Sequence, residues 1–138
     1  MGGCSSINFM LAVRGDSRGY DKWANELGCP NWSFSHVEPY FRRLENFDST
    51  SNMSSNVSRG KHGPIVIIDS QDKEFATKNI VEAFVQGNIE SGIEECDDYN
   101  APYVKSSASL SQMNIDNGKR CDTASAYLFG ENGAFKNC

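Results

Sequence analysis

Apolar residues recur every three or four positions along several segments of this chain, which is the pattern of an amphipathic helix. The first segment predicts a helix over residues 18–27. Asp16 or Ser17 would cap its start, because short polar side chains accept hydrogen bonds from the first free N–H groups of a helix. Gly28 would end it, since glycine adopts the left-handed conformation common just after a helix.

The second segment begins after Ser33 or Ser35 and places an apolar stripe along residues 37–44. Ser35 and Glu38 have the spacing of a capping box, in which each side chain bonds the backbone N–H of the other residue. Pro39 lies in or just after the first turn, so a kink is expected there.

A third helical pattern covers residues 72–91 and would stop at Gly92. It follows four consecutive β-branched residues, 65–68, which predict a buried strand. A mixture of such helices and strands indicates an α+β or α/β fold.

Towards the end of the chain, an irregular alternation predicts one strand over residues 109–115. Asn117-Gly118 is a strong signal for a tight turn, because both residues tolerate positive φ. A short helix would then start at Asp122 or Thr123 and run to Leu128.

The opening residues have a different character. Gly2 and Gly3 allow positive φ and a close approach of the backbone to a ligand. The hydroxyl and N–H groups that follow at Cys4, Ser5 and Ser6 can point at an anion. Turn chemistry alone gives such a loop an ordinary structural role as well, so both interpretations remain open.

Further motifs follow this loop in a recognisable order. The chain resembles the glucose–methanol–choline oxidoreductases in the sequence Gly-Gly-Cys-Ser-Ser-Ile-Asn at 2–8. The resemblance continues through Val13-Arg14-Gly15, Asn31-Trp32-Ser33, His62-Gly63-Pro64 and the run 117–128. It covers residues 1–128, and the sequence of these motifs is most similar to that of insect-type glucose dehydrogenases.

The resemblance implies a fragment of an FAD-binding Rossmann-like domain over residues 1–61. Residues 62–138 would form the incomplete start of a substrate-binding domain. The dinucleotide fingerprint would lie upstream and the catalytic histidine downstream, so no catalytic residue is assigned here. His36 and His62 do not match the family's catalytic motif.

The resemblance also implies that FAD lies beside the opening loop. Backbone and small side chains would contact it at the start of the loop, and Asn8 with the following backbone would line its isoalloxazine ring. The implied cofactor-binding residues are Gly3, Cys4, Ser5, Asn8, Phe9, Met10 and Leu11. The apolar segment 9–13 would be buried against this cofactor or against the core. Because Ile7 stands where a covalent flavin link would need histidine, the FAD is expected to be non-covalent.

The implied activity is that of a dehydrogenase or oxidase that transfers a hydride from a small alcohol or sugar to FAD. Quinone or oxygen would be the final electron acceptor, and this stretch of chain by itself would be inactive. The alternative is a truncated, non-catalytic secreted relative that acts by binding.

Charge and composition exclude several other classes. A net charge of −5 and a pI near 5.0 argue against nucleic-acid binding, which needs a basic surface. No apolar run approaches the length of a membrane span, since the longest is Phe9–Val13. The acidic cluster at 94–98 lacks the alternating ligands of a calcium loop and is expected to be a solvated loop.

The five cysteines include no Cys-x-x-Cys pair, so no metal site is expected. Their odd number means that they cannot all pair within this chain. Asn52 and Asn56 begin Asn-x-Ser sequons in the polar tract 49–58. Together with the secreted members of the family, these sequons favour an extracellular protein.

Overall fold

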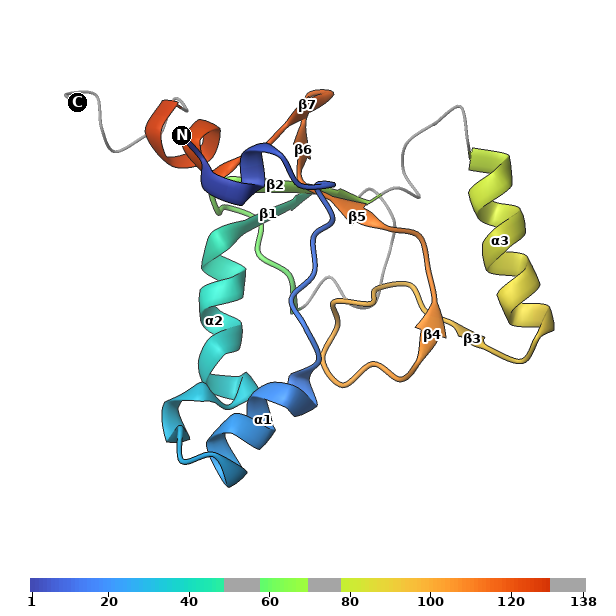
Figure 1. Ribbon diagram of the computed structural model, residues 1–138, viewed down its shortest axis with the longest axis horizontal. Helices are drawn as coiled ribbons and strands as arrows, with labels where there is room; N and C mark the ends of the chain where they lie inside the picture. Colours follow the sequence, from blue (N-terminus) through green and yellow to red (C-terminus); the bar gives the residue numbers. More distant parts are fainter. Residues whose placement is uncertain (49–57, 70–77, 130–138) are drawn as a thin grey trace.

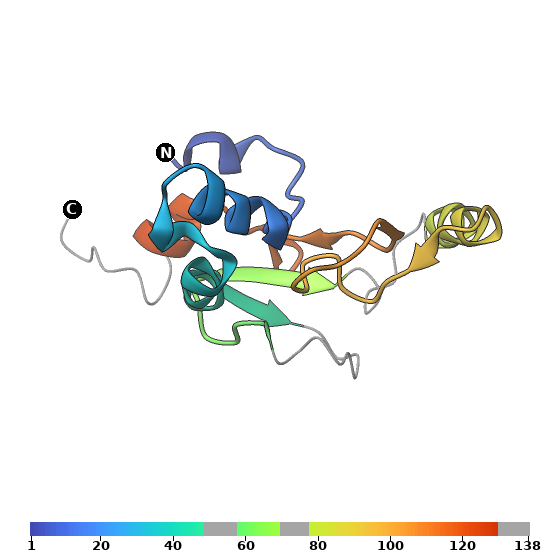
Figure 2. The same cartoon turned by 90° about the horizontal axis from the view of Figure 1, so that it is seen from below.

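The structure is a computed structural model that describes residues 1–48, 58–69 and 78–129. A small sheet lies at the centre, two helices lie on one side of it, and a third helix stands apart at the far end (Figures 1 and 2). This mixture of helices and strands confirms the expected fold class.

The central sheet has the order β1-β2-β5. Strand β2 (Ile65–Asp69) confirms the strand that the β-branched residues predict, and it is largely buried. It pairs in parallel with β1 (Glu45–Asp48) and antiparallel with β5 (Gln112–Met113). The sequence does not predict β1, because Glu-Asn-Phe-Asp contains a single apolar residue.

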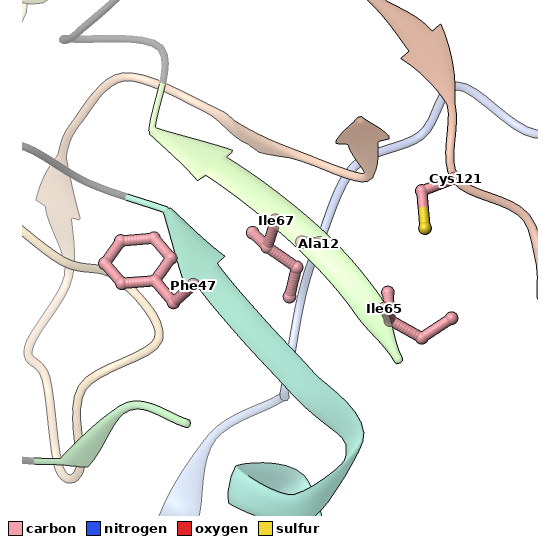
Figure 3. Close-up of a cluster of buried hydrophobic side chains, with 5 residues drawn as sticks. All are labelled: Ala12, Phe47, Ile65, Ile67 and Cys121. Atoms are coloured by element: carbon pink, nitrogen blue, oxygen red, sulfur yellow. The ribbon is translucent and has the colours of Figure 1, made fainter. Parts of the chain in front are cut away.

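Five residues from four segments of the chain form an apolar core on this sheet (Figure 3). They are Ala12, Phe47, Ile65, Ile67 and Cys121. The opening segment and the segment after the last hairpin therefore meet on the same two strands.

Helix α1 (Ser17–Glu26) confirms the first predicted helix. Its cap is Asp16, whose carboxylate accepts a hydrogen bond from the Arg18 N–H at 2.9 Å. Gly28 follows the helix with a φ of 72°. The short 3₁₀ helix η2 (Pro30–Trp32) then leads into α2.

Helix α2 (Phe34–Leu44) follows Ser33, and Pro39 lies inside it. The expected capping box is wrong, because Ser35 lies within the first turn and its hydroxyl bonds Ser33 Oγ at 2.9 Å. The Phe34 N–H instead donates to Asp21 Oδ1 at 2.9 Å, so a neighbouring helix supplies the cap.

Helix α3 (Lys78–Glu90) confirms the end of the third predicted helix. Gly92 follows with a φ of 88°. The predicted start at 72–77 lies outside the described residues. Of the apolar side chains of α3, Val85 is buried, whereas Ile80 and Phe84 are exposed.

The remaining strands are short. Strand β3 (Glu94–Glu95) pairs in parallel with β4 (Ser107–Ala108). Strands β6 (Ile115–Asp116) and β7 (Lys119–Arg120) form a hairpin. The single strand predicted over 109–115 is wrong, because the chain divides there between β5 and β6, which belong to different sheets.

The hairpin turn is confirmed, with φ values of 47° at Asn117 and 76° at Gly118. After it, Asp122 caps the last helical segment, whose final residues form the π-helix η5 (Ser125–Phe129). Asp122 Oδ1 accepts hydrogen bonds from the N–H groups of Ala124 and Ser125 at 2.8 and 2.9 Å.

Strands β1 and β2 come from opposite sides of the domain boundary expected near residue 62, yet they are direct neighbours in the sheet. The division into residues 1–61 and 62–138 stays a prediction.

Candidate cofactor site

The opening loop is held in an unusual backbone conformation. The short 3₁₀ helix η1 (Gly3–Ser6) follows Gly2, which has a φ of 95°. This φ strains any residue with a side chain, and a Cβ at Gly2 would in addition lie 2.2 Å from Ser6 Oγ, so glycine is favoured there. Gly3 has a φ of 57° and Met10 a φ of 62°. The backbone therefore turns sharply at both ends of the loop.

The segment after the hairpin supports this loop from behind. Thr123 donates its N–H to Ser5 Oγ and its hydroxyl to the Gly2 carbonyl, each at 3.0 Å. Arg120 adds three hydrogen bonds from one nitrogen, Nη1. They go to Ser5 O at 3.0 Å, Asn8 O at 2.8 Å and Asn8 Oδ1 at 3.0 Å. Figure 1 shows the opening helix beside the last helical segment.

The outer surface of the loop is apolar. Ile7 is 86% exposed and Phe9 88% exposed, and Leu11 also faces outward. Ala12 and Arg14 are buried between outward-facing residues. Burial of segment 9–13 against the core is thus wrong for Phe9, Leu11 and Val13, whereas burial against a cofactor stays a prediction.

Most of the predicted site residues are exposed on the loop, whereas Ser5 and Met10 are half-buried and the Ser5 hydroxyl faces Gly2 and Thr123. Cys4 and Phe9 are exposed, and Gly3 has open space where a Cβ would be. Asn8 shapes the loop as well, because its Oδ1 accepts from the Met10 N–H at 2.9 Å. Exposed apolar side chains and free space at Gly3 fit a flat aromatic group such as flavin, and nothing in the loop's geometry opposes it.

A buried ionic cluster lies beneath the site, and sequence reasoning missed it. Arg59 bonds Glu45 Oε1 at 2.9 Å and Asp98 Oδ1 at 3.1 Å, and none of these side chains reaches solvent appreciably. Arg14 pairs with Glu45 as well. The expectation of a solvated loop at 94–98 is therefore wrong for Asp98, and Glu94 and Glu95, although exposed, lie in strand β3. No spacing signal joins these residues, because their contacts depend on the tertiary fold.

Amide side chains extend the cluster to the opening segment. Gln112 donates to Asp98 Oδ1 at 2.7 Å and accepts from Asn100 Nδ2 at 2.8 Å. Asn100 Oδ1 accepts from the Arg14 N–H at 2.7 Å, and its Nδ2 donates to Ala12 O at 2.8 Å. The backbone that follows the loop is therefore anchored to the interior.

Burial shifts the pKa of two groups near the loop. Desolvation lowers the pKa of Arg14, and the Glu45 carboxylate opposes that shift. Within the described ranges, Arg14 Nε and Nη1 have no hydrogen-bond partner, although the Phe41 ring lies 5.7 Å from the guanidinium carbon. Desolvation also raises the pKa of the Cys121 thiol, because burial disfavours the charged thiolate.

Two hollows adjoin these residues. A cavity of about 220 Å³ lies under the loop, lined among others by Ser5, Arg14 and Thr123. A wider groove of about 1040 Å³ runs between α2 and residues 59–63. Among the described residues, no group of three His, Cys, Asp or Glu side chains could hold a metal. Nor does any helix in those ranges have the length and apolarity needed to cross a membrane.

The fold and the loop define a class of protein that comparison with known sequences identifies. The family profile of the GMC oxidoreductases matches residues 1–134, and the chain belongs to this family. An oxygen-dependent choline dehydrogenase of Brucella anthropi is 38% identical over 128 residues, which are 93% of this chain and 22% of that protein. The oxygen-dependent choline dehydrogenase of Photobacterium profundum is 35% identical over 128 residues, which are 21% of that protein.

Comparison with solved structures finds similar folds. An FAD-dependent oxidoreductase from Chaetomium thermophilum matches 91% of this chain with a TM-score of 0.74 and 27% identity, and 22% of that chain is covered. Pyridoxine 4-oxidase from Mesorbium loti matches 90% with a TM-score of 0.73 and 22% identity, and 23% of it is covered. The chain thus spans about 22% of the length of the relatives it matches. GMC homologues bind FAD.

Proposed function

We propose that the loop of residues 2–11 forms part of an FAD site and that the protein is an FAD-dependent oxidoreductase of alcohols or sugars. The observation that carries the proposal is the loop itself. It exposes an apolar surface and the bare backbone of Gly3, while Arg120 and Thr123 hold it in place. In a member of a family whose homologues bind FAD, this is the arrangement expected beside a flavin.

When bound, FAD would supply the chemistry of accepting a hydride from the carbinol carbon of the substrate. The residues of this chain would bind and orient the cofactor. Small residues at Gly3 and Cys4 allow close approach, and Ile7 and Phe9 would exclude water from the loop surface once FAD covers it. None of the described residues is assigned proton transfer. Because Ile7 has no atom that could form a flavin link, the attachment at this position would be non-covalent.

The cofactor assignment is tested first on the purified protein, expressed from its full-length gene. We expect the visible absorbance of oxidised flavin, and denaturation should release FAD into solution. A colourless protein that takes up no added FAD would overturn the cofactor assignment, and the non-catalytic binding relative would then be favoured. Flavin that stays with the denatured chain would overturn non-covalent attachment.

Two matched glycines test the loop directly. Gly3 and Gly28 both have positive φ and open space where a Cβ would lie, and Asn tolerates that conformation. We expect Gly3→Asn to lower the flavin content by placing a side chain where FAD approaches, and Gly28→Asn to leave it unchanged. Equal flavin content in both variants would contradict the placement of FAD at this loop.

The substrate and the electron acceptor can be identified by testing a panel of alcohols and sugars, choline included, and by measuring oxygen consumption and quinone reduction. We expect turnover of at least one compound with one of these acceptors.

We also propose that the protein is secreted, on the sequons at Asn52 and Asn56. Glycosidase treatment of the native protein should then lower its apparent mass.

A further inference from the structure

The side-chain amide of Asn8 is held in one orientation by two hydrogen-bond donors. The Met10 N–H points at the amide atom Oδ1 from 2.9 Å, and Arg120 Nη1 points at the same atom from 3.0 Å. Both groups can only donate. An NH₂ group in that position would face two donors at once, so the atom must be the oxygen.

This orientation leaves the other end of the amide directed away from the two donors. Nδ2 carries two N–H groups, and Asn8 is exposed on the loop surface. The loop therefore presents a hydrogen-bond donor beside the apolar side chains of Ile7 and Phe9. An unconstrained asparagine could present either its oxygen or its NH₂ group to a ligand, whereas this one can present only the NH₂ group without losing two hydrogen bonds.

Arg120 enforces this choice together with the Met10 N–H. Its Nη1 also bonds the carbonyls of Ser5 and Asn8, so one nitrogen joins the start and the middle of the loop from 112 or more residues away. All three bonds come from a single nitrogen, and a lysine ammonium likewise carries all its donors on one atom. Arg120 acts through Asn8 and is a positioning residue.

We infer that Asn8 is a fixed hydrogen-bond donor to an acceptor atom of the bound cofactor, and that Arg120 fixes its polarity. This inference rests on the proposed function, because the ligand is the FAD proposed for the loop. The inference adds that the NH₂ end of the Asn8 amide faces the ligand and that the distant residue Arg120 fixes this orientation.

Asn8→Asp and Asn8→Ala separate the donor from the loop shape. Aspartate keeps an oxygen for Met10 and Arg120 but replaces the outward NH₂ group by a second acceptor, whereas alanine loses both functions. Affinity for FAD is measured on the apoprotein of the full gene product by the change in flavin fluorescence. We expect Asn8→Asp to weaken binding about tenfold or more, at least as much as Asn8→Ala. Wild-type affinity in Asn8→Asp would overturn the inference.

Arg120 variants test the positioning role. We expect Arg120→Met to weaken FAD binding and to change the visible spectrum of the bound flavin, and Arg120→Lys to restore both in large part. Arg42→Gln, an exposed arginine of α2, is the matched control and should change neither. Equal loss in Arg120→Lys and Arg120→Met would contradict a role that one nitrogen fulfils.

A measurement on the unsubstituted protein covers the case in which a variant does not fold. With ¹⁵N-labelled asparagine, the Asn8 NH₂ signal should shift when FAD is added. An unchanged signal in protein that has bound FAD would overturn the inference. Wild-type protein that binds no FAD would instead overturn the proposed function, so the two failures are distinguishable.

Discussion

At the scale of single residues, two glycines show how far the surroundings decide a substitution. At Gly60 a Cβ would lie 1.8 Å from the Arg42 carbonyl oxygen, because the chain passes directly under the end of α2. At Gly87, inside α3, a Cβ would meet nothing within 4 Å. The sequence presents both simply as glycine, and only the fold distinguishes them.

We therefore expect opposite effects of the same substitution. Gly60→Ala should lower the free energy of unfolding by about 3 kcal/mol, since backbone must move to admit the methyl group. Gly87→Ala should raise it by about 0.5–1 kcal/mol, because alanine loses less conformational freedom in a helix. Urea unfolding followed by circular dichroism measures both. A Gly60→Ala variant as stable as the wild type would show that α2 does not end against this residue.

At the scale of elements, Tyr99 joins the segment after the loop to strand β5. Its hydroxyl donates to Ala12 O at 2.8 Å and accepts from the Gln112 N–H at 2.9 Å. Burial raises the pKa of Tyr99 above its ordinary value, because the charged form would be desolvated. The folded state thus favours the protonated phenol.

This shift predicts an alkaline loss of stability. A group whose pKa is raised on folding stabilises the fold below its unfolded pKa, and that contribution is lost as the pH rises through the folded value. For Tyr99 the loss should begin above about pH 10. Tyr99→Phe should be about 1 kcal/mol less stable at neutral pH, with a flatter decline above pH 10. The exposed Tyr127→Phe is the control, and unfolding curves across pH give the answer. Parallel declines in Tyr99→Phe and the wild type would count against this role of Tyr99.

At the scale of the whole molecule, the ionic cluster around Arg59 connects segments that are far apart in sequence. Glu45 opens β1, Gln112 opens β5, and Asp98 lies between β3 and β4. Arg59 Nη1 bonds Gln112 Oε1 at 2.7 Å in addition to Asp98. Removing this one side chain leaves two buried carboxylates, with Arg14 as the remaining cation at Glu45.

Arg59→Met should accordingly lower the free energy of unfolding by about 3–5 kcal/mol, because an uncompensated buried charge is costly. The exposed Arg42→Met should change it by less than about 0.5 kcal/mol. Thermal unfolding of both variants provides the comparison. Similar losses in the two variants would mean that the cluster contributes little beyond the general effect of losing an arginine.

Much of the local structure could be predicted from the sequence. Helix α1 with its Asp16 cap, the Asn117-Gly118 turn and the Asp122 cap all depend on contacts within four residues, so the residues that specify them are adjacent in the chain. The candidate site could be predicted as a contiguous loop because its residues are also contiguous. Its supports at Arg120 and Thr123 could not be assigned, since no spacing rule connects them to residues 2–8.

By itself, the sequence determined the Asn117-Gly118 turn, the helix caps at Asp16 and Asp122, the buried strand β2 and the resemblance to the GMC family. The tertiary structure alone decided that β1 is a strand, that Asp98 is buried and that Phe9 faces outward. The physical reason is the range of the interactions. Helices and turns close hydrogen bonds between near neighbours, whereas strand pairing, ion pairs and burial depend on segments that meet only after the chain has folded.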